Sequence, residues 1–325
     1  MIFKNLKKPY IIAEIGINHE GSFSSAKKHI IEAKKAGANA VKFQVFKPDT
    51  LAVQNSKKNK LQKKTSGKEG LSSIWKRVSL NTMSLKKLRN YSKKIKIDFI
   101  CTAFDFDSLK LVKKLNLDAI KVASSDVTDL PLLIEISKLK KPIILSTGMS
   151  NSEEISIALN LLKNKNVSIL HCVSLYPCNY SDANLNRILA LKKKFKKNVI
   201  GYSDHCKNFE ASIYALNLGA KIIEKHFTLN KKLPGNDHYH SMDLFDLRVI
   251  NKKIKEIQLI IGNKQKSFLS SEKNSRKFAR RSLVAKNQIY KNQKIRRKDL
   301  ICKRPGTGIQ PEKINQIIGK KATRN

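Results

Sequence analysis

The sequence predicts a (β/α)8 barrel followed by a small C-terminal domain. Short β-branched, apolar runs alternate with amphipathic helical patterns, the runs number eight, and no glycine-rich nucleotide loop follows the first of them. Eight parallel strands with helical crossovers favour a closed barrel over the alternative, a doubly wound open sheet. The predicted strands are 10–17, 40–46, 98–104, 119–125, 142–148, 167–173, 199–205 and 221–227.

Helical patterns fill the intervals between these strands. Their apolar residues recur at the three- and four-residue spacing of a helix with one buried face. The clearest are 25–36, 84–95, 108–115, 130–139, 152–162, 209–218 and 244–261. The polar segment 51–80, rich in Lys and Ser, is expected to be a long loop over one end of the barrel. We expect the barrel domain to span 1–262, a polar linker 263–277 and the small domain 278–325.

The composition of the chain argues against some classes of protein, such as membrane proteins and nucleic-acid-binding proteins. The net charge of +41 raises the question of nucleic acid, but the lysines are spread along the whole chain without a zinc-finger or RNA-binding signature. We interpret them as a solvated surface that attracts anionic small substrates. Without an apolar signal core or a membrane-length apolar run, a cytoplasmic protein is expected, with no membrane partner. The five cysteines lack metal spacing and are expected to be reduced.

Reactive side chains gather at the C-terminal ends of the predicted strands, where barrel enzymes carry their active sites. Such a rim predicts an enzyme. The polar residues at these ends are Glu14, Asn18, His19, Lys42, Gln44, Thr102, Lys121, Ser124, Ser146, Thr147, His171, Ser174, Ser203, His205, Glu224 and His226.

Two histidines end the last two strands. His205 shares a strand face with Ser203, and His226 shares one with Glu224, because side chains alternate along a strand. Neighbouring strands lie about 4.8 Å apart, so both imidazoles can reach one divalent cation. Two hydrogen-bonded structural histidines are the alternative. Cys206 points to the opposite face and is expected to pack in the core.

Two lysines point into the predicted barrel. Lys42 and Lys121 are costly to bury without a partner, and a bound carboxylate and phosphate would pair them. The hydroxyls of Ser124, Ser146 and Ser203 could donate to the same phosphate. The alternative is a salt bridge to a barrel acid, either Glu14 or Glu224.

Several runs together resemble one enzyme family. They follow the same order from about residue 10 to the C-terminus: IIAEIGINHEGS, AVKFQ, IKVASSD, PIILSTGM, HCVSLYP, IGYSDH, EKHFT and KRPGTGI. They closely resemble the sialic acid synthases, which include the N-acetylneuraminate, legionaminate and pseudaminate synthases. The resemblance implies a barrel with a C-terminal antifreeze-like (SAF) domain, in a domain-swapped homodimer. It also implies condensation of phosphoenolpyruvate with an N-acetylated mannosamine-type sugar, assisted by Mn²⁺ or another divalent cation such as Mg²⁺ or Co²⁺.

The resemblance also implies roles for individual residues. His205 and His226 resemble the metal ligands, and Glu14 resembles the catalytic acid or base. Glu224 is expected to be the second catalytic residue. Lys42, Lys121, Ser124, Ser146 and Ser203 resemble the phosphoenolpyruvate contacts, with Gln44 in the same substrate site. Tyr176 and Asp237 stand where sugar-pocket residues are expected. Arg304 resembles the arginine that the small domain sends into the neighbouring subunit to hold the N-acetyl group of the sugar.

The chain departs from the family pattern in places. Ser174 and Asp126 are still expected to bind substrate, although Ser174 stands where some members carry an asparagine near the phosphate and Asp126 where many carry a glutamate. The chain ends at Asn325, earlier than typical members, which predicts a small domain without its last strand.

The predicted product is an N-acetylneuraminate-type acid, with N,N'-diacetyllegionaminate or pseudaminate as alternatives. KRPGTGI and PGNDHYHSMD favour the first two over pseudaminate. A related phosphoenolpyruvate-condensing aldolase and a basic nucleic-acid-binding protein are the rival functions.

Overall fold

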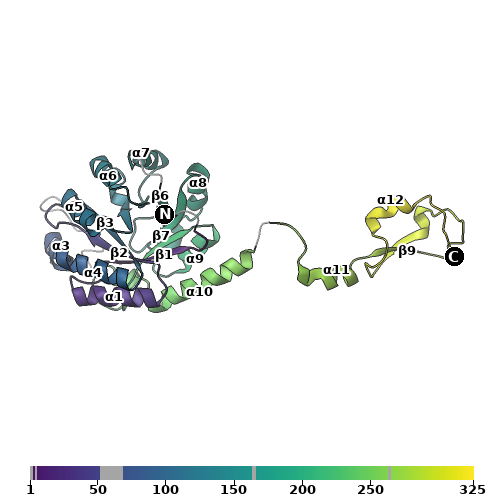
Figure 1. The fold of residues 1–325 in the computed structure, drawn as a ribbon, viewed down its shortest axis with the longest axis horizontal. Helices are drawn as coiled ribbons and strands as arrows, with labels where there is room; N and C mark the ends of the chain where they lie inside the picture. Colours follow the sequence, from purple (N-terminus) through teal and green to yellow (C-terminus); the bar gives the residue numbers. More distant parts are fainter. Residues whose placement is uncertain (1–2, 4–5, 52–68, 163–165, 263–264) are drawn as a thin grey trace. The chain divides into compact units, whose positions relative to one another are not determined.

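The chain folds into a closed eight-stranded parallel barrel and a separate small unit, in a computed structural model that describes residues 3, 6–51, 69–162, 166–262 and 265–325 (Figure 1). The compact units are Met1–Ile261 and Gly262–Asn325. Each strand pairs with the next, and the eighth closes onto the first, which confirms the predicted barrel. The strands are β1 (Tyr10–Gly16), β2 (Ala40–Val45), β3 (Asp98–Ala103), β4 (Ala119–Val122), β5 (Ile143–Ser146), β6 (Val167–Cys172), β7 (Val199–Asp204) and β8 (Ile222–His226).

Helices surround the barrel (Figure 1). Side chains that accept hydrogen bonds from the first helical turn cap several of them: Ser22 caps α1, Asn81 caps α4 and Asp105 caps α5. The helices are α1 (Phe23–Lys35), α3 (Leu71–Val78), α4 (Thr82–Lys94), α5 (Phe106–Leu115), α6 (Leu130–Ser137), α7 (Ser152–Leu162), α8 (Arg187–Lys194), α9 (Glu210–Asn217) and α10 (Leu244–Ile261).

The barrel interior has an apolar layer below a polar one. An apolar cluster of inward-facing residues, including Ile12, Ile100, Ile144 and Ile222, fills the N-terminal part. Two residues further along each strand the side chain points inward again, and there the sequence supplies polar groups. Glu14 follows Ile12 in this way, and Glu224 follows Ile222. The alternation therefore places the polar layer at the C-terminal end of the barrel.

Two segments differ from the sequence predictions. Of the expected long loop 51–80, residues 52–68 lie outside the described part, and Leu71–Val78 forms helix α3. The helix forms because Ile74 and Val78, four residues apart, are both buried on one face. The expected linker 263–277 overlaps helix α11 (Lys273–Ala279), whose Arg276 guanidinium stacks over the ring of Phe268 at 4.4 Å.

The small unit contains a two-stranded antiparallel sheet of β9 (Ser282–Ala285) and β10 (Leu300–Lys303), with the short helix α12 (Ile314–Ile317). Leu283 and Leu300 are its buried apolar residues among those described. Arg304 follows β10 directly and is exposed. In the described part of the chain, no helix has the length and apolar character needed to cross a membrane.

Candidate active site

A cavity of about 400 Å³ lies at the C-terminal end of the barrel. Its wall includes every site residue predicted from the sequence except Asp126, Asp237 and Arg304. The lining residues are Glu14, Lys42, Gln44, Thr102, Phe104, Lys121, Ala123, Ser124, Ser125, Ser146, Met149, Cys172, Ser174, Tyr176, Ser203, His205, Glu224 and His226. Strands far apart in the sequence meet here because their C-terminal ends share one rim.

Two lysines and two glutamates form a buried charge network in this wall. Lys42 Nζ lies 2.8 Å from Glu14 Oε2 and 3.9 Å from Glu224 Oε1, and Lys121 Nζ lies 3.8 Å from the same Glu224 oxygen. Gln44 donates to Glu14 at 3.0 Å. The lysines are thus paired with barrel acids, the alternative to a bound anion. Burial lowers the pKa of Lys121, whereas Glu14 and Glu224 outweigh the burial of Lys42 and raise its pKa. An anionic ligand bound beside them would favour the charged form of both lysines.

The two glutamates differ in acidity. Burial raises the pKa of Glu14, and Lys42 only partly opposes this. Burial would also raise the pKa of Glu224, but Lys121 and Lys42 outweigh it, and a 3.1 Å hydrogen bond from Ser203 Oγ adds to their effect, so its pKa is lowered. Carboxyl groups whose pKa values move apart in one site are suited to different roles. Glu14 is the one suited to exchange a proton.

A group of serines forms another part of the wall. The hydroxyls of Ser146 and Ser174 are buried and have no hydrogen-bond partner among the described residues. Ser124 Oγ accepts a hydrogen bond from the Gly148 N–H at 2.9 Å. A Cβ at Gly148 would lie 2.4 Å from Ser174 Oγ, so only glycine leaves this group its space. Unpartnered buried donors are costly, and a bound anion would satisfy them.

His205 and His226 lie side by side in the wall, with ring centres 5.9 Å apart. His205 Nδ1 lies 2.7 Å from the Val173 carbonyl oxygen, so Nδ1 carries the proton and Nε2 keeps its lone pair. Burial lowers the pKa of His226 well below its ordinary value, so this ring is neutral. Its Nδ1 has no hydrogen-bond partner in the described part of the chain. Burial lowers the pKa of His205, but Cys172 and the Val173 carbonyl outweigh it, so its pKa is raised. In its neutral form His205 presents the Nε2 lone pair beside the ring of His226, and two such imidazoles fit a divalent cation.

The protein offers few further ligands for such a cation. Across the described residues, no group of three or more His, Cys, Asp or Glu side chains is arranged to hold a metal. A cation held by the two histidines would therefore need ligands from water or substrate, as catalytic metal sites commonly have.

The three predicted site residues that are absent from the cavity wall lie in different places. Asp126 belongs to a short 3-10 turn after β4, where Ser125 donates to it at 2.8 Å. Asp237 Oδ2 lies 3.5 Å from His226 Nδ1, beside the cavity. Arg304 belongs to the small unit and forms no ion pair or hydrogen bond with the described residues.

Two residues beside the histidine pair, His240 and Cys172, carry no signal of a functional role in the sequence. His240 is fully buried, its ring centre lies 5.2 Å from that of His226, and both its nitrogens lack a partner among the described residues. It sits in the loop after β8, where strand periodicity gives no signal. Cys172 lies 3.7 Å from His205 Nδ1 and looks like a core residue in the sequence. Cys206 is buried, as predicted.

A parallel barrel whose rim combines paired lysines, buried serine hydroxyls and two adjacent histidines has the features of an enzyme site for small anions. The chain belongs to the NeuB family, whose family model matches residues 29–266, and residues 280–325 match the SAF domain. These matches confirm the resemblance inferred from the sequence.

Individual relatives span nearly the whole chain. N,N'-diacetyllegionaminic acid synthase of Campylobacter jejuni is 40% identical over 98% of this chain and 97% of its own. Pseudaminic acid synthase of Helicobacter pylori is 31% identical over 98% and 95%. The crystal structure of N-acetylneuraminic acid synthetase from Leptospira borgpetersenii, 32% identical, superposes with a TM-score of 0.73 over 83% of this chain and 90% of its own.

Proposed function

We propose that this protein condenses phosphoenolpyruvate with the open-chain form of an N-acetylmannosamine-type sugar, giving a nine-carbon 2-keto sugar acid and phosphate. The observation that carries the proposal is the pairing of Lys42 and Lys121 with barrel acids beside the free hydroxyls of Ser146 and Ser174. Fixed positive charges and donors in a buried wall stabilise a doubly anionic substrate better than water does. Family membership supports the same chemistry.

The reaction has two bond-forming steps. The methylene carbon of phosphoenolpyruvate attacks the sugar aldehyde carbon, so the C=C electron pair becomes the new C–C bond and the aldehyde oxygen takes a proton. Water then adds to the electron-poor C2 and loses a proton. The C2 hydroxyl then loses its remaining proton, and an oxygen electron pair forms the C=O bond. The C2–O bond to phosphate breaks, phosphate leaves with that electron pair, and the ketone remains.

Glu14 is proposed to move protons in this sequence. Its raised pKa brings its protonated and ionised forms closer in energy near neutral pH, which suits general acid–base catalysis. Glu224, whose pKa is lowered, is proposed to stay ionised and hold both lysines in place. In this arrangement phosphoenolpyruvate would draw Lys42 away from Glu14 on binding and leave that carboxyl easier to protonate.

A divalent cation, Mn²⁺ in the first instance, is proposed at His205 and His226. When bound there it would supply Lewis-acid polarisation of the sugar carbonyl. The chain contributes the tautomer of His205, set by the Val173 carbonyl, and the neutral ring of His226.

The type of acceptor sugar is proposed from the residues beside the two histidines and from the relatives of the chain. Asp237 and Tyr176 lie next to the two histidines, where the aldehyde end of a sugar would sit. N-acetylmannosamine is the proposed acceptor type. The diacetamido acceptor that leads to N,N'-diacetyllegionaminate is the second candidate, because the relative of that name is 40% identical, against 31% for the pseudaminic acid synthase.

The small unit is proposed to complete the site in a swapped homodimer. Arg304 is exposed, has no partner within the described residues, and presents a planar fork of donors that suits an amide oxygen. The Arg304 of one protomer would reach the sugar bound by the other.

Phosphate release tests the proposal. The purified chain is mixed with phosphoenolpyruvate, Mn²⁺ and each of three acceptors: N-acetylmannosamine and the precursors of legionaminate and pseudaminate. We expect release only when cation and an N-acetylated acceptor are both present, with a 2-keto acid of matching mass. Release without a sugar, or with a sugar lacking the acetamido group, would instead favour another phosphoenolpyruvate-condensing enzyme.

A further inference from the structure

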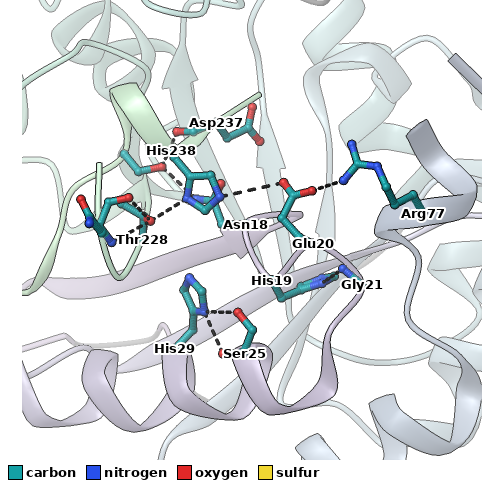
Figure 2. Close-up of polar contacts among 12 residues, drawn as sticks. Asn18, His19, Glu20, Gly21, Ser25, His29, Arg77, Thr228, Asp237 and His238 are labelled. Atoms are coloured by element: carbon teal, nitrogen blue, oxygen red, sulfur yellow. Dashed lines mark hydrogen bonds and ion pairs between the residues drawn. The ribbon is translucent and has the colours of Figure 1, made fainter. Parts of the chain in front are cut away.

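Glu20, in the loop after β1, lies between helix α3 and the loop that follows β8. Its carboxylate forms an ion pair with Arg77 of helix α3, and its Oε1 lies 3.9 Å from Nε2 of His238 in the loop after β8 (Figure 2). Arg77 also pairs with Glu69 at 3.3 Å. The β1–α1 loop thus links the segment before α4 to the segment before α10.

The surrounding backbone fits closely around this carboxylate. A Cβ at Gly21 would lie 2.2 Å from the Arg77 carbonyl oxygen, and one at Gly235 would lie 2.7 Å from Glu20 Oε1. Both glycines also have positive φ, at +75° and +145°. The end of helix α3 therefore lies against the backbone of Gly21, and the loop after β8 lies against the Glu20 side chain.

His238 lies between Glu20 and the residues that border the cavity. It is almost fully buried, and its Nδ1 lies 2.7 Å from the Thr228 hydroxyl, two residues beyond the end of β8 (Figure 2). Its Nε2, which faces Glu20, has no hydrogen bond within the described residues. Its neighbour Asp237 reaches His226, and His240 packs against the same ring.

We propose that Glu20 is a positioning residue for the acceptor sugar. Its carboxylate pairs with Arg77 and packs 3.9 Å from the His238 ring, and through these two contacts it holds the loop 227–243, and with it Asp237 and His240, beside the cavity. Helix α3 then helps to set the shape of the sugar pocket without touching the sugar. This inference rests on the proposed function for its substrate, but the link between α3 and the loop can be measured without turnover.

Steady-state kinetics test the sugar assignment. Glu20→Gln keeps the side-chain shape and removes the charge that holds Arg77, and Arg77→Met removes the other partner. Each is expected to raise KM for the sugar about fivefold and to leave KM for phosphoenolpyruvate and kcat within about twofold. The double variant should be no worse than Arg77→Met alone, because Arg77→Met already removes the pair with Glu20 together with the pair with Glu69.

The matched control is Arg89→Met. Arg89 pairs with Asp118 at 3.4 Å, just before β4, and so at the opposite end of the barrel. Its loss should leave both KM values unchanged. An equal rise in sugar KM for Arg89→Met, or equal rises for both substrates in Glu20→Gln, would show that Glu20 affects only general stability and would overturn the proposal.

Trp75, the single tryptophan of the chain, provides a reporter in helix α3 that does not depend on activity. In Glu20→Gln, acrylamide should quench Trp75 about twice as strongly, and amide hydrogens of 229–243 should exchange faster, with no change in Arg89→Met. Unchanged quenching and exchange would refute the link itself. Absence of turnover by the unaltered chain with every acceptor would instead overturn the proposed function and the sugar assignment with it, while quenching and exchange still decide the link.

Discussion

Asp204 and Lys225 form a buried ion pair, 3.3 Å between Oδ2 and Nζ, on the residues that directly precede His205 and His226. They are also register partners between β7 and β8. Ser212 donates to Asp204 at 2.6 Å, and Lys225 donates to the Cys206 carbonyl. The pair joins the two strands at the point where the histidines begin.

Breaking this ion pair should be costly. Lys225→Met leaves the Asp204 carboxylate buried without its cation, which typically costs about 3–5 kcal/mol of the free energy of unfolding. Adding Asp204→Asn removes the unpaired charge and should recover most of the loss. Urea unfolding measures both. A single variant as stable as the unaltered chain would show that water or another group compensates for the missing cation.

Removing either histidine should abolish cation binding while the barrel stays folded. His205→Ala and His226→Ala each delete one of the two proposed ligands, so we expect loss of Mn²⁺ binding in titrations and at least a hundredfold loss of turnover. His29→Gln is the control, because His29 is buried in α1 and is absent from the cavity wall. Mn²⁺ binding that survives in both alanine variants would refute the metal site.

Lys121→Ala should weaken phosphoenolpyruvate more than sugar. Lys121 is buried in the cavity wall, 3.8 Å from Glu224, and its replacement removes a positive charge that would stabilise a bound anion. We expect KM for phosphoenolpyruvate to rise at least tenfold and KM for the sugar to rise less than threefold. Equal rises for the two substrates would count against this role.

Asp126 gives a pH-dependent prediction. Burial raises the pKa of its carboxyl from 3.8 to about 6, and its Oδ2 has no partner in the described part of the chain. Because the unfolded state ionises first, the Asp126 contribution to stability falls as pH rises from about 4 to about 6. Asp126→Asn cannot ionise, so its free energy of unfolding should exceed that of the unaltered chain by about 1–3 kcal/mol at pH 8, but not at pH 3.5. A stability difference that is constant across pH would contradict the burial argument.

The strands and most of the cavity wall could be predicted because both follow a period of two. Ile12 and Glu14, or Ile222 and Glu224, reveal an apolar layer beneath a polar one. Loops give no such signal, so the place of His240 against His226 emerged only in the fold.

The sequence pattern does not indicate helix α3, for a related reason. Lysines and serines surround its segment, and only Ile74 and Val78 mark its buried face. The contact of Glu20 with Arg77 joins residues 57 positions apart, and no local pattern indicates it.

The last prediction concerns Arg304, which belongs to the small unit rather than to the barrel. If it serves the sugar bound by a partner protomer, Arg304→Ala and His226→Ala chains should each be inactive alone yet regain part of the activity when mixed. A mixed dimer has one site with an intact metal pair and an intact arginine, so about a quarter of normal turnover is expected if half the dimers are mixed, since each mixed dimer has one working site of two. Mixed dimers, verified by differently tagged chains, that remain inactive would show that Arg304 acts within its own chain. A charge-retaining Arg304→Lys chain separates the two properties of the side chain: if it stays inactive alone and is rescued in the same mixture, the planar fork of the guanidinium is what the sugar requires.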